Sequence, residues 1–183
     1  MANSPNIVVY FAHLAIEQSV INRVLCDAVR DIRHVNFRDL LELYPDFFID
    51  VKKEQEVLRD ADLIVFQSPI YWYAAPAIFK HFQDTVLLRG FAYGPGGTML
   101  QGKDFLLAVS TGAPAEDYRP GGIHHYAFED LIRPIEQTAR FCGMQFLPPL
   151  VLHGGHSLPS EEIEAHAARY RRFLEDYQPG NNR

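Results

Sequence analysis

Short apolar runs recur along this chain, and each is followed by a polar loop and then by a segment with helical spacing. The first run, Ile7 to Ala12, is rich in β-branched residues and contains no charged residue, which is typical of a strand buried on both faces. Ser19 follows the loop His13 to Gln18 and stands where an N-cap begins a helix, because apolar residues recur after it at helical spacing. The pattern therefore predicts a strand, a loop and a helix in succession.

The succession of strand, loop and helix recurs along the rest of the chain. Further strands are predicted at Arg33 to Phe37, which is a weak pattern, Asp62 to Gln67, Asp104 to Ser110 and Gln145 to Leu152. Helices are predicted near Lys52 to Arg59, from Pro76 toward Leu88, from about Phe128 to Phe141 and from Pro159 to Tyr177. Pro134, inside the third of these helices, is expected to kink the helix or delay its start. The stretch Leu43 to Asp50 is expected to form an apolar loop.

Five strands that alternate with helices, without repeats or linkers, predict a doubly wound α/β domain in three layers. Right-handed crossovers and a helix after each strand favour the flavodoxin-like strand order 2-1-3-4-5. We expect one domain over residues 1–183, with a disordered tail at 178–183. In this order the loops after the first, third and fourth strands meet at the switch point, where a ligand is expected to bind.

Composition and charge narrow the possible partners. The chain has 183 residues and 17 basic against 23 acidic side chains, for a net charge of −6, which disfavours nucleic acid. It has no apolar run long enough to span a bilayer and no signal peptide at Met1 to Asn6, so a cytoplasmic protein is expected. Cys26 and Cys142 lack the spacing of metal ligands or of a disulfide framework, so neither a metal site nor a disulfide is expected.

The first loop is a candidate phosphate site. The free amides of a helix N-terminus attract anions, and Ser19, Val20 and Asn22 fall in the first turn of the predicted helix, with His13 as a further donor. The loop contains no glycine, so it matches neither the P-loop nor the dinucleotide fingerprint. A serine at this position is more often only a helix cap, and that alternative stays open.

Two further loops offer the surroundings of a flat ring. Pro69 and Pro76 bracket a loop after the third strand, and its residues Ile70, Tyr71, Trp72 and Tyr73 combine backbone groups with three aromatic rings. The fourth strand ends in Ser110, Thr111, Gly112 and Ala113, where the glycine permits close approach of a ligand.

Tyr118 and His124, six residues apart in the next loop, are candidates to supply or accept protons. The alternative is that both are ordinary loop residues.

The chain resembles the flavodoxin-like NAD(P)H:quinone oxidoreductases, and most closely the bacterial ancillary proteins of glutathione-gated potassium efflux (Kef) systems. The likeness extends from Ile7 to about Tyr170. Its most specific segments are Leu43 to Asp50, Ala61 to Pro69, Arg89 to Gly97 and Phe141 to Gly143. The first loop departs from the family pattern at Leu14 and Ala15, so phosphate binding is expected to depend more on Ser19, Asn22 and the helix end.

The resemblance implies a flavin whose phosphate lies on the first loop and whose ring edge meets the loops at 70–73 and 110–113. It implies FMN, with FAD as the alternative, and NADPH or NADH as the reductant. It also implies Tyr118 and His124 as the catalytic pair, because the quinone reductases carry a Tyr and a His at this spacing. The expected reaction is a ping-pong exchange, in which the nicotinamide leaves before a quinone-like acceptor takes a hydride.

The resemblance further implies a homodimer. The main alternative is a regulatory subunit of a potassium/proton antiporter, peripheral on the inner face of the membrane. A flavodoxin-type electron carrier is a third hypothesis, weakened because no acidic surface run is evident.

Overall fold

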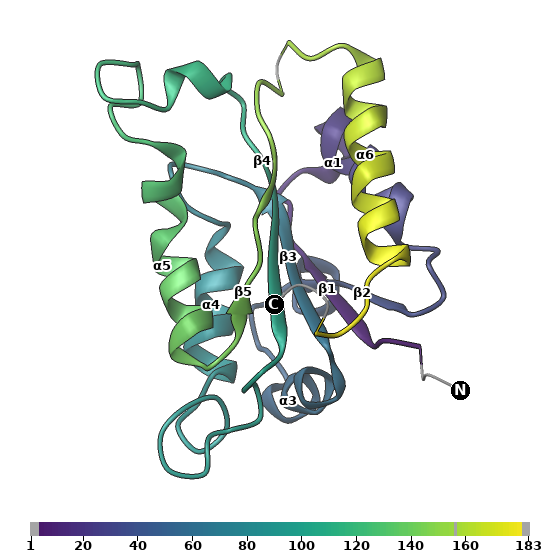
Figure 1. Cartoon of the computed structure of the whole chain (residues 1–183), viewed down its shortest axis with the longest axis vertical. Coiled ribbons are helices and arrows are strands. Elements are labelled where there is room, and N and C mark those ends of the chain that lie inside the picture. The colour runs from purple at the N-terminus through teal and green to yellow at the C-terminus, as the bar shows by residue number, and fades with distance from the viewer. Residues whose placement is uncertain (1–3, 156, 181–183) are drawn as a thin grey trace.

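A parallel sheet runs through the centre of the computed structural model, which describes residues 4–155 and 157–180 (Figure 1). Its strands are β1 (Ile7–Phe11), β2 (Val35–Asp39), β3 (Leu63–Pro69), β4 (Asp104–Ser110), β5 (Gln145–Phe146) and β6 (Leu150–Leu152). The order is β2-β1-β3-β4-β5. β5 pairs with the start of β4, and β6 pairs with its end. The predicted flavodoxin-like order is therefore confirmed.

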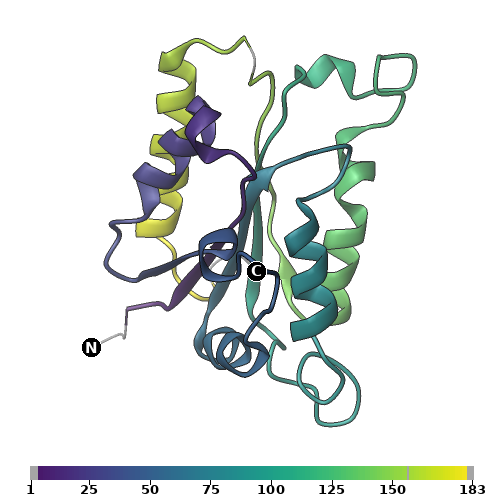
Figure 2. The same ribbon diagram turned by 180° about the vertical axis from the view of Figure 1, so that it is seen from behind.

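Helices cover both faces of this sheet (Figures 1 and 2). Residues of α1 (Val20–Val29) and α6 (Ser160–Glu175) join the core on one face. Residues of α3 (Val51–Asp60), α4 (Ala77–Val86) and α5 (Phe128–Phe141) join the core on the other face. The remaining helical segments are α2 (Leu40–Leu43) and the 3₁₀ turns Ile16–Gln18 and Ala115–Asp117.

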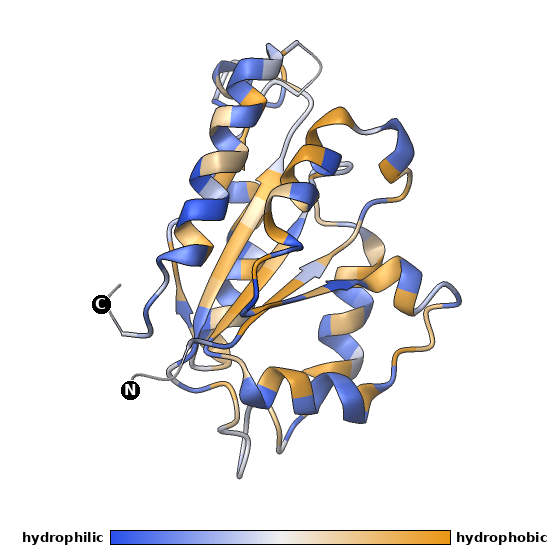
Figure 3. Ribbon diagram, turned by 90° about the vertical axis from the view of Figure 1, so that its right-hand side faces the viewer, coloured by the Kyte–Doolittle hydropathy of each residue, from blue (hydrophilic) through white to orange (hydrophobic). Residues whose placement is uncertain are grey.

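The central strands are predominantly apolar because both of their faces are covered, and their polar residues lie near the strand ends. Val8 and Tyr10 of β1 enter the core under α3, α4 and α5, whereas Ile7 and Val9 enter the core under α1 and α6. This alternation follows from the two-residue repeat of a strand. Figure 3 shows the strands as predominantly apolar and the outward faces of the helices as polar. Burial on both faces thus explains why apolar residues follow one another in these strands instead of alternating with polar ones.

Some boundaries differ from the prediction. β2 runs over Val35–Asp39 rather than Arg33 to Phe37, because the weak pattern of this edge strand did not define its ends. The last predicted strand is two pieces, and Pro148 and Pro149, which lack the N–H that a ladder needs, lie in the gap between them. Pro134 does not delay α5, which begins at Phe128 as predicted.

A short helix precedes the predicted loop at Leu43 to Asp50. Asp39 caps α2 by accepting hydrogen bonds from the N–H groups of Leu41 and Glu42. Four residues are too few for a helical period, so the pattern did not reveal this helix. At the other end of the chain, residues 178–180 of the predicted tail are exposed, and residues 181–183 lie outside the described part.

A buried carboxylate joins α3 to the sheet. Glu54 is fully buried and accepts hydrogen bonds from Arg38 Nε at 3.0 Å and from Tyr10 Oη at 2.9 Å. The hydroxyl of Tyr44 also donates to Glu54, and burial together with this bond raises the pKa of Tyr44 to about 12. The cluster therefore connects β1, β2, α3 and the loop after α2. A buried charge of this kind is tolerated only while its partners remain.

Replacing Glu54 with Gln tests this cluster. The substitution keeps the shape of the side chain and removes the charge that faces Arg38, so we expect the free energy of unfolding to fall by about 3–5 kcal/mol. Urea unfolding followed by circular dichroism measures the change. Glu56→Gln, at an exposed position of the same helix, is the matched control and should stay within about 0.5 kcal/mol of the parent. Equal losses in the two variants would contradict a stabilising role for the cluster.

Candidate functional site

A cleft of about 480 Å³ opens at the carboxyl ends of β1, β3 and β4, where the loops were predicted to meet. Most of the predicted cofactor residues line it, namely His13, Ser19, Val20, Asn22, Pro69, Ile70, Tyr71, Ser110, Thr111 and Gly112. The volume is that of a small-molecule pocket. The described lining residues include no carboxylate, so the cleft is compatible with an anion.

The N-terminus of α1 forms one end of this cleft. Ser19 caps the helix, because its Oγ accepts a hydrogen bond of 3.1 Å from the N–H of Asn22. The amide N–H groups of Val20 and Ile21 belong to the first turn and have no carbonyl partner within the helix. They are therefore available to an anion.

Asn22 connects this helix end to the end of β4. Its buried side chain donates from Nδ2 to Ser19 Oγ at 3.0 Å and to Ser110 Oγ at 3.2 Å. Its Oδ1 is shielded from water and has no hydrogen-bond partner among the described residues. A buried polar atom without a partner is costly unless a ligand satisfies it. The structure thus unites the first loop and the β4 loop, as predicted, through one amide side chain.

His13 joins the first loop to the loop after β3. Its Nδ1 accepts a hydrogen bond of 3.0 Å from the N–H of Ala15, and its Nε2 lies 3.0 Å from Tyr71 Oη. A neutral imidazole with its proton on Nε2 satisfies both contacts, since that nitrogen then donates to Tyr71. Burial lowers the pKa of His13 and favours this neutral form. The hydroxyl proton of Tyr71 remains available to a ligand in the cleft.

Trp72 and Tyr73 lie beyond the cleft wall, in a tight turn. Tyr71 and Ala74 exchange main-chain hydrogen bonds of 2.8 and 3.0 Å, which close the turn on both sides. Trp72 and Tyr73 consequently adopt the left-handed backbone conformation, with φ of 48° and 66°. Residues other than glycine rarely adopt this backbone conformation, so the turn is strained. It leaves Trp72 92% exposed, and neither residue joins the cleft lining; the same holds for the predicted Ala113.

The predicted catalytic pair is brought together by the loop after β4. The rings of Tyr118 and His124 stack with centroids 4.4 Å apart and an interplanar angle of 18°. Tyr73 meets the edge of His124 at 5.6 Å, which connects the pair to the strained turn. Both ring nitrogens of His124 are shielded from water and lack a hydrogen-bond partner within the described residues. Neither Tyr118 nor His124 is among the residues that line the cleft.

The segment after β6 also reaches the site, which the sequence pattern did not predict. The N–H of Gly155 donates to Thr111 O at 2.8 Å, and a Cβ at this glycine would lie 2.6 Å from Ile21 Cδ1. A larger residue would require the end of the Ile21 side chain to move and would also crowd Thr111 O at 3.1 Å. The pair Gly154-Gly155, which follows the last predicted strand after one residue, is the sequence feature that could have indicated this close contact.

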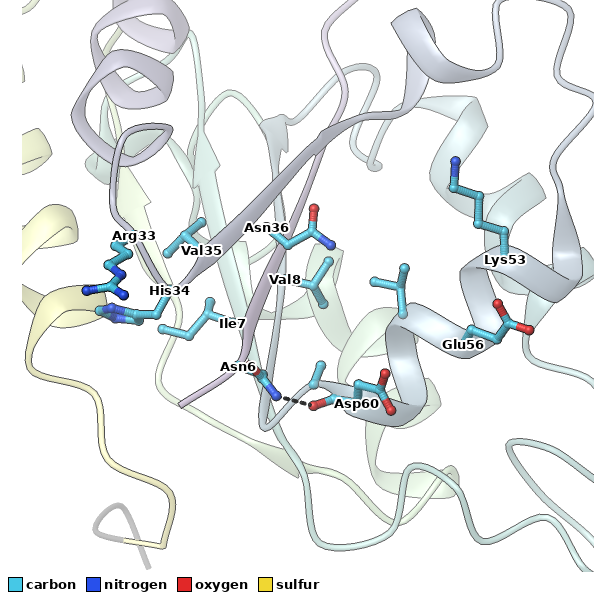
Figure 4. A pocket seen from close by; sticks show the side chains of 12 residues that line it. Asn6, Ile7, Val8, Arg33, His34, Val35, Asn36, Lys53, Glu56 and Asp60 are labelled. Carbon is cyan, nitrogen blue, oxygen red and sulfur yellow. Dashed lines mark hydrogen bonds between the residues drawn. The ribbon is translucent and has the colours of Figure 1, made fainter. Parts of the chain in front are cut away.

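A second hollow, of about 440 Å³, lies at the opposite end of the sheet (Figure 4). Arg33 and His34 border one side of it, whereas Lys53 and Glu56 border the other. Its charged groups of both signs are spread around the rim and do not converge on one point. The cleft at the carboxyl ends is therefore the better candidate for the functional site.

Fold and cleft together define a class of protein: a flavodoxin-like α/β domain with a helix end for an anion and an aromatic loop beside it. The chain belongs to the family described as having a flavodoxin-like fold, whose model matches residues 5–174. The resemblance predicted from the sequence is thereby confirmed at the level of the family.

Among curated proteins, the chain is similar to the glutathione-regulated potassium-efflux system ancillary protein KefG of Serratia proteamaculans. The two are 41% identical over 183 residues, which is 100% of each chain. Within the described residues, no helix of this protein has the length and apolar character needed to cross a membrane.

Solved structures with this fold carry different descriptions. One, described as a thermophilic tryptophan halogenase from Streptomycin violaceusniger, has a TM-score of 0.88 at 43% identity and covers 93% of this chain and 99% of its own. General stress protein 14 of Treponema denticola, solved in complex with FMN, has a TM-score of 0.88 at 36% identity, with coverages of 95% and 100%. An NADPH-quinone reductase from P. pentosaceus has a TM-score of 0.85 at 26% identity, with coverages of 94% and 99%.

The protonation of His13 gives a pH-dependent prediction. Because burial lowers its pKa in the folded protein, the unfolded chain binds this proton more readily. The contribution to stability is present above about pH 6.5, the ordinary pKa of histidine, and is lost as the pH falls through the lowered value. An NMR titration of the imidazole should therefore give a midpoint below about 6.5.

His13→Gln should make the free energy of unfolding less dependent on pH in this range. His125→Asn controls for the loss of an exposed imidazole. A His13 midpoint at or above the ordinary value would contradict the assignment of a neutral ring.

Proposed function

We propose that this chain is a flavin-dependent NAD(P)H:quinone oxidoreductase that binds FMN in the cleft. The FMN complex of the Treponema denticola protein and the NADPH-quinone reductase among the solved relatives support this proposal. The observation that carries it within the chain is the stacked pair Tyr118 and His124, whose imidazole nitrogens have no partner among the described residues.

The residues of the cleft fit a flavin phosphate. The amides of Val20 and Ile21 and the hydroxyl of Ser19 are donors at the N-terminus of α1, where the helix dipole favours negative charge. Asn22 holds Ser19 in place and contributes a further amide group. No lysine or arginine lines the described cleft, so oriented neutral donors would bind the phosphate.

The ring of the flavin would lie against the two loops that border the rest of the cleft. Pro69, Ile70 and Tyr71 would meet one part of its edge, and Ser110, Thr111 and Gly112 another, whereas Trp72, Tyr73 and Ala113 lie outside the lining of the cleft. Ile70 donates its N–H to Ser110 O at 2.8 Å, so the two loops are already joined. FAD is the alternative cofactor, because its phosphate group requires the same helix end.

A flavin in this cleft would supply the hydride chemistry of a ping-pong exchange between NADPH or NADH and the acceptor. The protein's part is to position the acceptor and to manage its protons. The hydroxyl of Tyr118 and an N–H of His124 would hydrogen-bond the oxygen of a quinone-like acceptor and stabilise the charge that develops there. Tyr73, against the edge of His124, would limit the approach of water.

A homodimer is part of the proposal. Trp72, Ile123 and Tyr126 are large apolar side chains in the loops that follow β3 and β4, and each is well exposed. Exposed apolar groups near a cleft often mark an interface. A second copy that covers these side chains would also close the mouth of the cleft.

The test begins with the cofactor. We expect the purified protein to bind FMN with a Kd below about 10 μM, measured by quenching of flavin fluorescence, and to reduce a soluble quinone with NADPH or NADH. Tyr118→Phe and His124→Gln should each lower kcat/KM for the quinone about 100-fold, the smaller effect expected for a lost general acid or base, while FMN affinity is retained.

His125→Asn, at an exposed position in the same loop, is the matched control and should turn over like the parent. A protein that binds neither FMN nor FAD refutes the redox function. Unchanged quinone turnover in Tyr118→Phe and His124→Gln refutes only the assignment of the pair.

The second candidate function is that of a regulatory ancillary subunit of a potassium/proton antiporter. The observation that favours it is the 41% identity to the KefG protein over the entire length of both chains. In this function the protein would bind the cytoplasmic side of the antiporter, and the flavin would report redox state without turnover. Both functions are compatible with one cleft.

Potassium flux distinguishes the two functions. In cells that express this chain with a potassium antiporter of the glutathione-regulated class, we expect the chain to raise efflux and to co-purify with the antiporter. Tyr118→Phe with His124→Gln, which removes quinone turnover, should leave the efflux unchanged if regulation is independent of catalysis. Absence of both co-purification and an effect on efflux would exclude the regulatory function.

A further inference from the structure

The loop at the end of β4 is held from behind by the segment that follows β6. The N–H of Thr111 donates to Leu152 O at 2.9 Å, and the N–H of Gly154 donates to Ala113 O at 2.8 Å. Together with the bond from Gly155 to Thr111, these contacts continue the β4–β6 pairing past the ends of both strands. The backbone at 111–113, which borders the cleft, therefore depends on residues some 40 positions later in the chain.

His153 adds a side-chain contact to this pairing. Its Nδ1 lies 2.9 Å from Thr111 Oγ1, and Thr111 Oγ1 donates its own hydrogen to Ala113 O at 2.9 Å. Because a hydroxyl has one hydrogen, Thr111 must accept from the Nδ1–H of His153. Burial lowers the pKa of His153 although Glu129 opposes the shift, so the ring is neutral with this nitrogen protonated.

The other side of the same imidazole packs against the proposed catalytic pair. The ring of Tyr118 lies 5.4 Å from that of His153, and Phe128 at the start of α5 meets His153 edge-on at 4.9 Å. Tyr118 in turn stacks on His124. One half-buried ring thus contacts both the flavin-side loop, through Thr111, and the acceptor-side pair, through Tyr118.

We propose that His153 is a positioning residue that sets the place of Tyr118 and His124 relative to the loop 111–113. The proposal rests on the function proposed above, because it concerns the distance between the flavin edge and the groups that bond the acceptor. His153 is not among the residues that line the cleft. Its hydrogen bond orders the loop, and its ring supports Tyr118.

Two substitutions separate these contributions. His153→Asn keeps an N–H donor at a similar distance from the main chain but removes the ring, whereas His153→Phe keeps a ring and removes the donor. His153→Phe should weaken FMN binding about tenfold, the effect of roughly one neutral hydrogen bond, and leave quinone kcat near the parent value. His153→Asn should keep the FMN Kd within about twofold and lower quinone kcat at least tenfold. Because Thr111→Val removes the hydrogen bond to His153 and also the one to Ala113, adding His153→Phe to it should weaken FMN binding no further.

Measurements on the protein without cofactor separate this proposal from the proposed function. Amide hydrogen exchange at 111–113 should accelerate in His153→Phe but not in His153→Asn. The ring-current shift that Tyr118 imposes on the imidazole protons of His124 should change in His153→Asn but not in His153→Phe. Failure of the parent protein to bind flavin or to reduce a quinone would refute the proposed function whatever these variants do.

If His153 only stabilised the fold, the two variants would behave differently from these expectations. Both variants would then lose FMN affinity, quinone kcat and thermal stability in parallel, and the exchange and ring-current changes would appear together. That result, or two variants that match the parent in every measurement, would overturn the positioning role of His153.

Discussion

A parallel sheet that is covered on both faces leaves the backbone of its inner strands unpaired only at the two ends of each strand. In this protein β1, β3 and β4 are buried along their whole length, so the polar groups at their carboxyl ends must find partners in loops, helix ends or ligands. Part of this demand is met by the contacts among the loops after β3, β4 and β6. The remainder, at the N-terminus of α1 and around Asn22, forms the cleft. The burial of these strands that stabilises the fold therefore also produces the cleft.

The elements that the sequence predicted best are those whose burial is uniform. β4 begins and ends at the predicted residues, and α1 begins directly after its predicted cap Ser19. β2 lies at the edge of the sheet and is only partly buried, so its pattern was too weak to set its ends. α2 depends on a local cap rather than on periodicity, and the split of the last strand depends on two prolines.

The residues of the candidate site could be proposed from the sequence where they stand together in one loop. The first loop, the proline-bracketed aromatic loop and the pair Tyr118 and His124 each stand close together in the sequence. His153 was not predicted, because its meaning comes from contacts with Thr111 and Tyr118, 42 and 35 positions away, and a single histidine after a strand has no characteristic pattern. The left-handed conformation of Trp72 and Tyr73 was equally hidden, since neither residue type favours it.

The comparisons define the family more firmly than the reaction. Chains with this fold have been described as a halogenase, a stress protein with FMN and a quinone reductase, whereas the full-length relative is an ancillary protein of a potassium-efflux system. A common fold does not determine chemistry, so the choice among functions rests on individual groups in the site. The stacked pair Tyr118 and His124 and the neutral donors at the end of α1 are the groups on which the proposed function depends.

The turn at Trp72 and Tyr73 has a consequence for how this chain can change. Two successive bulky residues in the left-handed region cost roughly 1–3 kcal/mol each, a cost that glycine would avoid. Substitutions to glycine would relieve this strain, but they would remove the indole and the phenol from the turn. Backbone relaxation and aromatic surface consequently place opposite demands on these two positions.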